Sequence, residues 1–142
     1  MRPRHTAAIV AAVLIGAPMA NAAEPTGTWL TEKADARIRV APCGKSLCGT
    51  VVWVKDAIDP ATGKPPVDDK NPDPAKRSRK IVGMRIFSMN LDSNGIWAGP
   101  IYNSDDGKNY AGRLLMQGAD ALQVNGCAGV LCGGELWRRV GK

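Results

Sequence analysis

The chain has 142 residues and a formal net charge of +6, a mildly basic balance that favours anionic neighbours without requiring them. Its basic residues are scattered along the sequence, which disfavours nucleic-acid binding. The only histidine is His5, so a chain that loses its first residues has no Ser-His-Asp or Cys-His nucleophile and no histidine ligand for zinc or haem.

Residues 1–22 have the three parts of a secretory signal peptide. Arg2 and Arg4 provide a positive start, residues 6–17 are almost wholly small or apolar, and small residues precede a cleavage point that we place after Ala22. The apolar run is about a dozen residues, whereas a spanning helix needs roughly 20. We therefore predict export to the periplasm or the extracellular space, and no transmembrane segment.

Residues 23–142 have the length of one domain and show short strand-like stretches between turn residues. In 36–41, for example, Arg37 and Arg39 alternate with apolar residues, which is typical of a half-buried strand. The pattern predicts an all-β fold, a small antiparallel barrel of about eight strands. The expected strands are 27–31, 36–41, 49–54, 81–89, 96–102, 110–116, 121–124 and 134–140.

The four cysteines form two copies of a C-x4-C spacing, each beside glycine and between predicted strands. Residues that flank a short hairpin loop come within disulfide range across the ladder. We therefore predict the pairs Cys43–Cys48 and Cys127–Cys132. Pairing between the two hairpins and a tetrahedral zinc site are the alternatives, and an oxidising compartment disfavours zinc.

Residues 55–80 form a long polar loop that contains five prolines and cannot join a central ladder. A helical turn is expected from Pro74 to Arg79, with Asp73 as its cap. The acidic residues, the asparagine and the arginines of this loop make it a candidate lid that binds a carboxylate or a phosphate. The alternative is a solvated loop held by its own turns and Asp–Arg pairs. The candidate ligand-binding residues are Asp68, Asp69, Asn71, Asp73, Arg77 and Arg79.

Several segments resemble a family of uncharacterised secreted bacterial proteins, domain of unknown function 2147. They include GTWL (27–30), ARIRVAPCGKSLCGTVVWVKD (36–56), DDKNPDPAKRSRKIVGM (68–84) and IYNSDDGKNY (101–110). The resemblance implies a calycin-like barrel related to lipocalins, with no activity to carry over. Gly-Thr-Trp at 27–29 is also similar to the G-x-W that opens the first lipocalin strand. This likeness implies a structural Trp29 that packs against an arginine near the chain's end, either Arg138 or Arg139.

Trp53 and Trp97 are candidates to line an interior cavity, and core packing is the alternative for each. No acidic cluster has the spacing of a calcium loop, so we predict no metal and no cofactor. The leading hypothesis is non-enzymatic binding of a small or amphipathic molecule in the barrel. The second is an envelope-associated module that binds a protein or an anionic lipid surface. The third is a carboxylate-based hydrolase, which needs two acids facing one cleft.

Overall fold

The computed structural model describes residues 9–13 and 24–142. The cleavage point at Ala22 and most of the expected signal peptide lie outside the described residues, so the boundary between 1–22 and 23–142 stays a prediction. Within the described part of the chain, no helix has both the length and the apolar character needed to cross a membrane.

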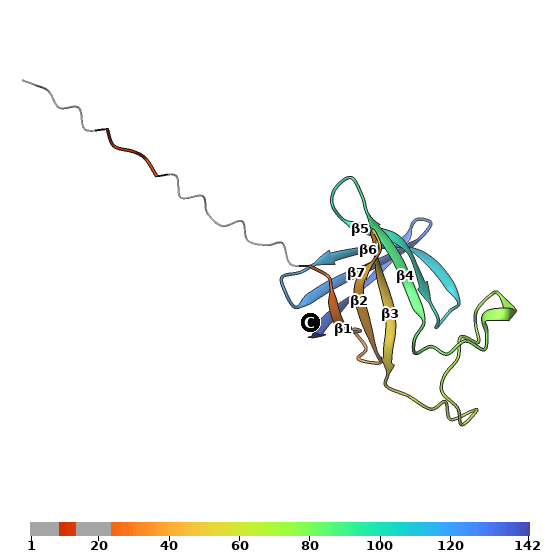
Figure 1. Cartoon of the computed structure of the whole chain (residues 1–142). Coiled ribbons are helices and arrows are strands. Elements are labelled where there is room, and N and C mark those ends of the chain that lie inside the picture. The colour runs from red at the N-terminus through yellow and green to blue at the C-terminus, as the bar shows by residue number, and fades with distance from the viewer. Residues whose placement is uncertain (1–8, 14–23) are drawn as a thin grey trace, which may run out of the picture.

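Eight antiparallel strands close into a barrel in which each strand pairs with the next and β8 pairs back with β1 (Figure 1). The strands are β1 (Gly27–Leu30), β2 (Ala36–Cys43), β3 (Ser46–Val54), β4 (Arg85–Leu91), β5 (Trp97–Asn103), β6 (Lys108–Met116), β7 (Ala121–Ala128) and β8 (Leu131–Gly141). The predicted all-β barrel with one long polar loop is confirmed. Within that loop lies a short 3-10 turn, η1 (Pro74–Lys76), which the Asp73 side chain caps by accepting a hydrogen bond from the main chain.

Strand β4 begins at Arg85, whereas the sequence predicted a strand over 81–89. Gly83 has a φ of 95°, which is outside the extended region that a strand requires. Its N–H donates to the carbonyl of Val51 at 2.7 Å, and the N–H of Val51 donates to the carbonyl of Met84 at 2.9 Å. The chain therefore turns beside β3 before it enters β4.

The predicted disulfides Cys43–Cys48 and Cys127–Cys132 are both present, which excludes the zinc alternative and pairing between the hairpins. Both strands of each hairpin extend through their cysteines to a turn of two residues. Cys127 and Cys132 lie directly opposite each other, with their Cα atoms 4.1 Å apart. Cys43 lies opposite Ser46 instead, so its bond to Cys48 runs diagonally across the ladder with the Cα atoms 5.8 Å apart.

The middle of the barrel is filled by side chains rather than left open. A continuous core joins every strand except β5 through fully or nearly buried residues, and Trp97 and Ile101 of β5 pack against it. Glycines make room for the larger members, because a Cβ at Gly49 would overlap the ring of Phe87. The buried core residues are Trp29, Ile38, Val40, Leu47, Val51, Phe87, Met89, Leu114, Leu122, Val124 and Trp137.

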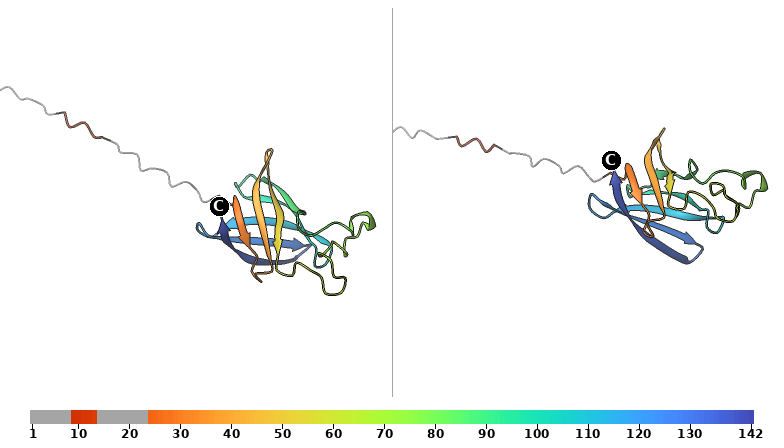
Figure 2. Two further views of the ribbon diagram at one scale, coloured as in Figure 1. Left: turned by 60° about the horizontal axis from the view of Figure 1, so that its bottom comes forward. Right: turned by 90° about the horizontal axis from the view of Figure 1, so that it is seen from below.

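The two ends of the barrel carry different connections (Figure 2). The tail end carries the segment before β1, the β2–β3, β4–β5 and β6–β7 turns and the C-terminus. The loop end carries the remaining turns and the long loop 55–80. Lys70 holds this loop to the β5–β6 turn, because its Nζ donates to the carbonyl of Asp105 at 2.8 Å. A Cβ at Gly107 would overlap the Lys70 carbonyl, so the close approach of loop and turn depends on glycine.

Candidate functional site

At the tail end, a tryptophan and an arginine hold the segment before β1 to the barrel. Trp29 is fully buried, its Nε1 donates to the carbonyl of Pro25 at 2.8 Å, and the Arg139 guanidinium lies 4.3 Å from its ring centroid. The structure thus places Arg139 on the indole, in a geometry suited to a cation–π interaction. Arg139 also donates to three main-chain carbonyls, those of Glu24, Thr26 and Ala119.

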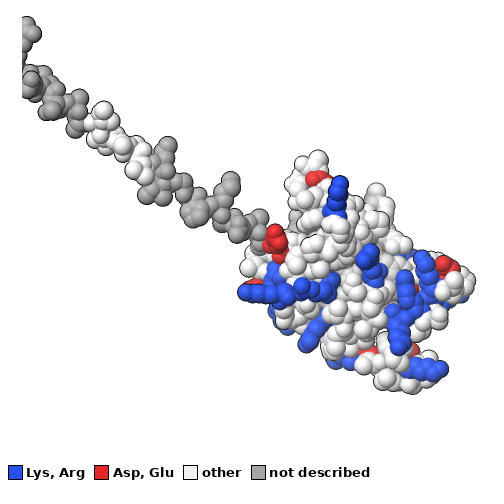
Figure 3. Space-filling model, viewed as in Figure 1, with Lys and Arg blue, Asp and Glu red and all other residues white. Residues whose placement is uncertain are grey.

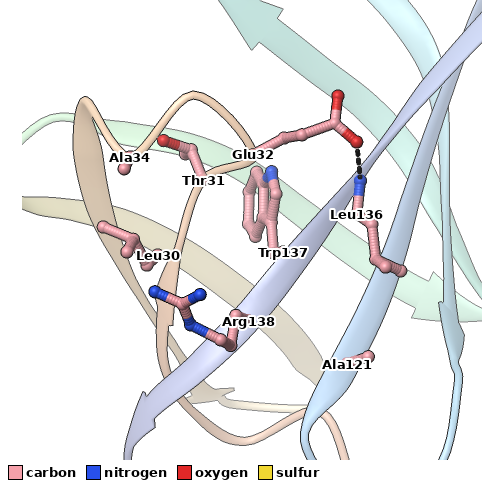
Figure 4. A pocket seen from close by; sticks show the side chains of 8 residues that line it. All are labelled: Leu30, Thr31, Glu32, Ala34, Ala121, Leu136, Trp137 and Arg138. Atoms are coloured by element: carbon pink, nitrogen blue, oxygen red, sulfur yellow. Dashed lines mark hydrogen bonds between the residues drawn. The ribbon is translucent and has the colours of Figure 1, made fainter.

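Arg138, the other candidate, does not stack on Trp29 but lines a cavity of about 360 Å³ where β1 ends and β8 continues. Figure 4 shows this cavity with Trp137 at its centre and Glu32 reaching across from the β1–β2 turn. A carboxylate oxygen of Glu32 accepts a hydrogen bond from the N–H of Leu136 at 3.2 Å. Glu32 therefore accepts a hydrogen bond from the Leu136 N–H at a point of β8 that no longer pairs with β1.

A larger cleft of about 1020 Å³ lies at the tail end, and we call it the tail cleft. Its floor includes Leu47, Leu114 and Leu122, which belong to the barrel core. Trp97, the first residue of β5, is half-buried between this floor and the solvent. The remaining lining residues are Glu24, Pro25, Thr26, Pro42, Gly44, Lys45, Ser46, Leu91, Gly95, Ile96, Leu115 and Met116.

One wall of the tail cleft is fixed by two links. The Cys43–Cys48 disulfide spans the β2–β3 hairpin that forms this wall. The hydroxyl of Ser46 also donates to the Asn90 side chain at 2.7 Å, which ties the same hairpin to β4. These links hold the hairpin wall of the cleft against β4.

Trp53 faces out of the barrel, contrary to the expectation that it lines an interior cavity. Strict alternation from the inward-facing Val51 would turn Trp53 inward as well. A β-bulge inserts Val52 as an extra residue, because Ile38 pairs with Val51 and the preceding residue of β2 pairs with Trp53. That preceding residue is Arg37, whose guanidinium lies 4.8 Å from the ring centroid of Trp53 on the outer face.

The candidate lid residues form an internal network around Asp68, whose side chain is fully buried. One carboxylate oxygen accepts from the hydroxyl of Tyr102 at 2.6 Å. The other accepts from the Asn71 amide at 2.8 Å and from the Arg79 guanidinium at 2.9 Å. This carboxylate therefore joins both halves of the loop to β5, and its oxygens are already occupied.

The other lid candidates serve the same loop or face solvent. The side chain of Asp73 caps η1, and the Asn71 side chain accepts from the N–H of Asp73 at 2.9 Å. Arg77 donates through Nε to the carbonyl of Asn71 at 2.7 Å, and Asp69 is exposed. No described residue of 55–80 lines either cavity. The arrangement matches the alternative in which the loop is held by its own contacts.

Burial alone would raise the pKa of Asp68, but the hydrogen bonds from Tyr102, Asn71 and Arg79 outweigh it and hold the pKa below its usual value. Burial and the bond to this carboxylate raise the pKa of Tyr102 to about 12. Tyr102 thus stays a hydrogen-bond donor and Asp68 an acceptor near neutral pH. The sequence offered no signal for this pairing, since the two residues lie 34 positions apart.

The described residues contain no group of three or more His, Cys, Asp or Glu side chains placed to hold a metal ion. Among the described lining residues, each of the two cavities has a single carboxylate, Glu24 in the tail cleft and Glu32 in the smaller cavity. Hydrolysis by paired carboxylates needs two acids flanking one bond. Neither cavity offers this pair.

Comparison with known proteins places the chain in a family and supports its fold. The sequence model of the family DUF2147, described as an uncharacterized protein conserved in bacteria, matches residues 27–139. The structure is similar to that of protein HP1028 from Helicobacter pylori, which is described as belonging to the lipocalin family. That similarity has a TM-score of 0.70 and 19% sequence identity, and it covers 84% of each chain. No significant match was found among curated proteins.

Proposed function

The chain belongs to the bacterial family DUF2147 and folds as a lipocalin-like barrel, and we propose that it binds a small amphipathic molecule in the tail cleft without chemical turnover. One observation carries this proposal. The tail cleft opens directly onto the apolar core, and Trp97 stands half-buried beside that floor. Ligand sites are typically concave, mostly apolar and preformed, with a few polar groups that orient the ligand.

The charged and polar groups of the tail cleft favour an amphipathic ligand over a purely apolar one. Glu24, Lys45 and Ser46 line the cleft together with the apolar floor. A ligand can bury an apolar part against Leu47 and Leu114 and keep a polar part near these groups. The single carboxylate of the lining supports binding rather than hydrolysis.

A fluorescence titration with 1-anilinonaphthalene-8-sulfonate, an amphipathic anion with apolar rings, tests the site. We expect saturable binding to the native protein. Met116→Trp should abolish it, because Met116 pairs with the buried Leu122 and a larger side chain there fills the cleft from β6. Trp97→Ala should weaken it about tenfold, or by about 1.4 kcal/mol, because it removes an aromatic side chain that can anchor the ligand.

Trp53→Ala is the matched control, because it removes an indole that lies on the outer face and lines neither cavity. Its titration should retain the saturable binding that the tail cleft provides. Binding that survives Met116→Trp, or that Trp53→Ala weakens as much as Trp97→Ala, would overturn the tail cleft as the site.

The proposal includes export with removal of residues 1–22. Its support is the charged start, the short apolar run and the two disulfides, which form in oxidising compartments. Native mass spectrometry of protein isolated from its own cells without detergent should give the mass of a chain that starts at Ala23. A chain that retains Met1 would contradict export by this route.

A further inference from the structure

We propose that the outer face of β2, β3 and β4, together with residues 76–85, docks on a bilayer rich in anionic phospholipid. We call this surface the basic face. It is independent of the tail cleft, because its arginines and its exposed apolar residues do not line that cleft. The inference rests on the strand register, on the distribution of charge and on an exposed tryptophan beside arginine.

The strand register aligns three arginines on one side of the sheet. Ile38 is buried in the core, so its neighbours Arg37 and Arg39 project from the opposite face of β2. Arg39 pairs with Thr50 of β3, and Thr50 pairs with Arg85 of β4. Because directly paired residues share a face, the arginines of β2 and β4 flank β3 on its outer side.

The long loop adds charge of the same sign. Residues 76–85 contain five basic residues and no acidic one, and all five are exposed. Arg79 forms an ion pair with Asp68. Among the described residues, no ion-pair partner is found for Lys76, Arg77, Lys80 and Arg85. Figure 3 shows lysine and arginine side chains spread across this side of the molecule, with few acidic ones among them.

An apolar group lies between these charges. Val52 is 45% exposed, Trp53 36% and Val82 45%. The hydrogen bond from Gly83 to Val51 brings Val82 alongside the bulge that exposes the other two. Arg37 lies over the Trp53 ring, so an apolar indole and a cation lie next to each other on this face.

This combination favours a bilayer surface over other anionic partners. Tryptophan prefers the level of the lipid headgroups, and basic residues are attracted to anionic leaflets by about 1 kcal/mol each, which is about fivefold in binding. Arginine forms paired hydrogen bonds with phosphate. A purely soluble polyanion would use the arginines but gain nothing from exposed Trp53 and its valine neighbours.

Vesicle sedimentation tests the proposal with the chain from Ala23 onward, so that the apolar residues 6–17 cannot account for binding. All eight strands and the whole core lie within 27–141, so this chain contains the complete barrel. We expect binding to vesicles of phosphatidylglycerol and phosphatidylcholine, loss of binding at high salt, and no binding to phosphatidylcholine alone.

Arg37→Gln combined with Arg85→Gln should weaken binding to the anionic vesicles about 25-fold. The matched control is Lys108→Gln combined with Arg113→Gln, which removes the same charge from β6. The control should weaken binding less than threefold, because those side chains lie outside the basic face. Equal losses in both pairs would show that net charge alone attracts the protein and would overturn a defined docking face.

Lipids brominated on their acyl chains provide a second readout, and the measurement on the native protein does not depend on the stability of any variant. They should quench part of the tryptophan emission of the native protein, and Trp53→Phe should remove that part. Absence of quenching with bound vesicles would overturn the proposal, as would equal binding to phosphatidylcholine vesicles. Soluble polyphosphate that binds as tightly as the anionic vesicles would instead identify a soluble polyanion as the partner.

Discussion

Asp68 is the residue on which the position of the long loop depends most. It is a fully buried acid, and its partners come from the loop itself and from β5. A buried charge is stable only when its hydrogen-bonding capacity is met. The described structure leaves no buried side-chain nitrogen or oxygen without a partner, and this network includes the two buried polar residues Asp68 and Asn71.

Asp68→Asn should destabilise the fold by about 2 kcal/mol at pH 7, because an amide nitrogen would face donors from Tyr102 or Arg79. The folded-state pKa of Asp68 lies below its unfolded value, so its stabilising contribution is present above about pH 4 and is lost as the pH falls through the folded pKa. Chemical denaturation of both proteins between pH 7 and pH 2 should therefore show a difference that shrinks toward acid.

Asp69→Asn is the control, because the neighbouring acid is exposed and its removal should change the unfolding free energy by less than about 0.5 kcal/mol. A difference between native protein and Asp68→Asn that stays constant down to pH 2 would contradict the role assigned to ionised Asp68.

At the scale of elements, the two cysteine hairpins have the same spacing but different registers. The turn is Gly44-Lys45 in one and Gly129-Val130 in the other, so it begins one position later after the first cysteine in the second hairpin. The spacing therefore predicted the pairing correctly but not the geometry. The second hairpin ends in the exposed Val130, whereas the first forms a wall of the tail cleft.

Removing either disulfide by paired Cys→Ala substitution should cost about 2 kcal/mol, the chain-entropy value for so small a loop. Only Cys43→Ala with Cys48→Ala should also weaken 1-anilinonaphthalene-8-sulfonate binding, since it frees the wall of the tail cleft. Denaturant unfolding and the fluorescence titration separate the two effects. Equal weakening by Cys127→Ala with Cys132→Ala would indicate a general loss of rigidity instead.

Local patterns were enough to predict the hairpins, the cap at Asp73 and the number of strands, because each depends on a few adjacent residues. The direction of Trp53 was not predictable, since it depends on a bulge between β2 and β3 that alternation alone does not reveal. The start of β4 was missed because Gly83 contacts β3 rather than continuing a strand. Errors of this kind arise where pairing between strands overrides local preference.

For the whole molecule, closure of the barrel creates the candidate site. The tail cleft combines residues from before β1, from the β2–β3 and β4–β5 turns, and from β6 and β7. These segments meet only after all eight strands have paired, so no spacing in the sequence could indicate them. The residues of the expected polar lid form a loop held by its own contacts, and the candidate cleft lies at the opposite end of the barrel, where it opens onto the core.

Close packing around Gly49 predicts that Gly49→Ala lowers the free energy of unfolding. Gly49 does not have a positive φ, so alanine adds no backbone strain, but its Cβ would overlap the ring of Phe87. A packed core cannot give way easily, and we expect a loss of about 1–3 kcal/mol in denaturant unfolding. Gly133→Ala on β8 is the matched control, because its Cβ would meet no heavy atom within 4 Å.

Phe87→Leu should rescue part of that loss, since a smaller side chain leaves space for the new methyl group. The double variant should therefore be more stable than the sum of the two single losses predicts. If Gly49→Ala is neutral and Phe87→Leu brings no rescue, the interior has free space beside β3. A ligand would then have room inside the barrel, and the tail cleft would lose its advantage as the binding site.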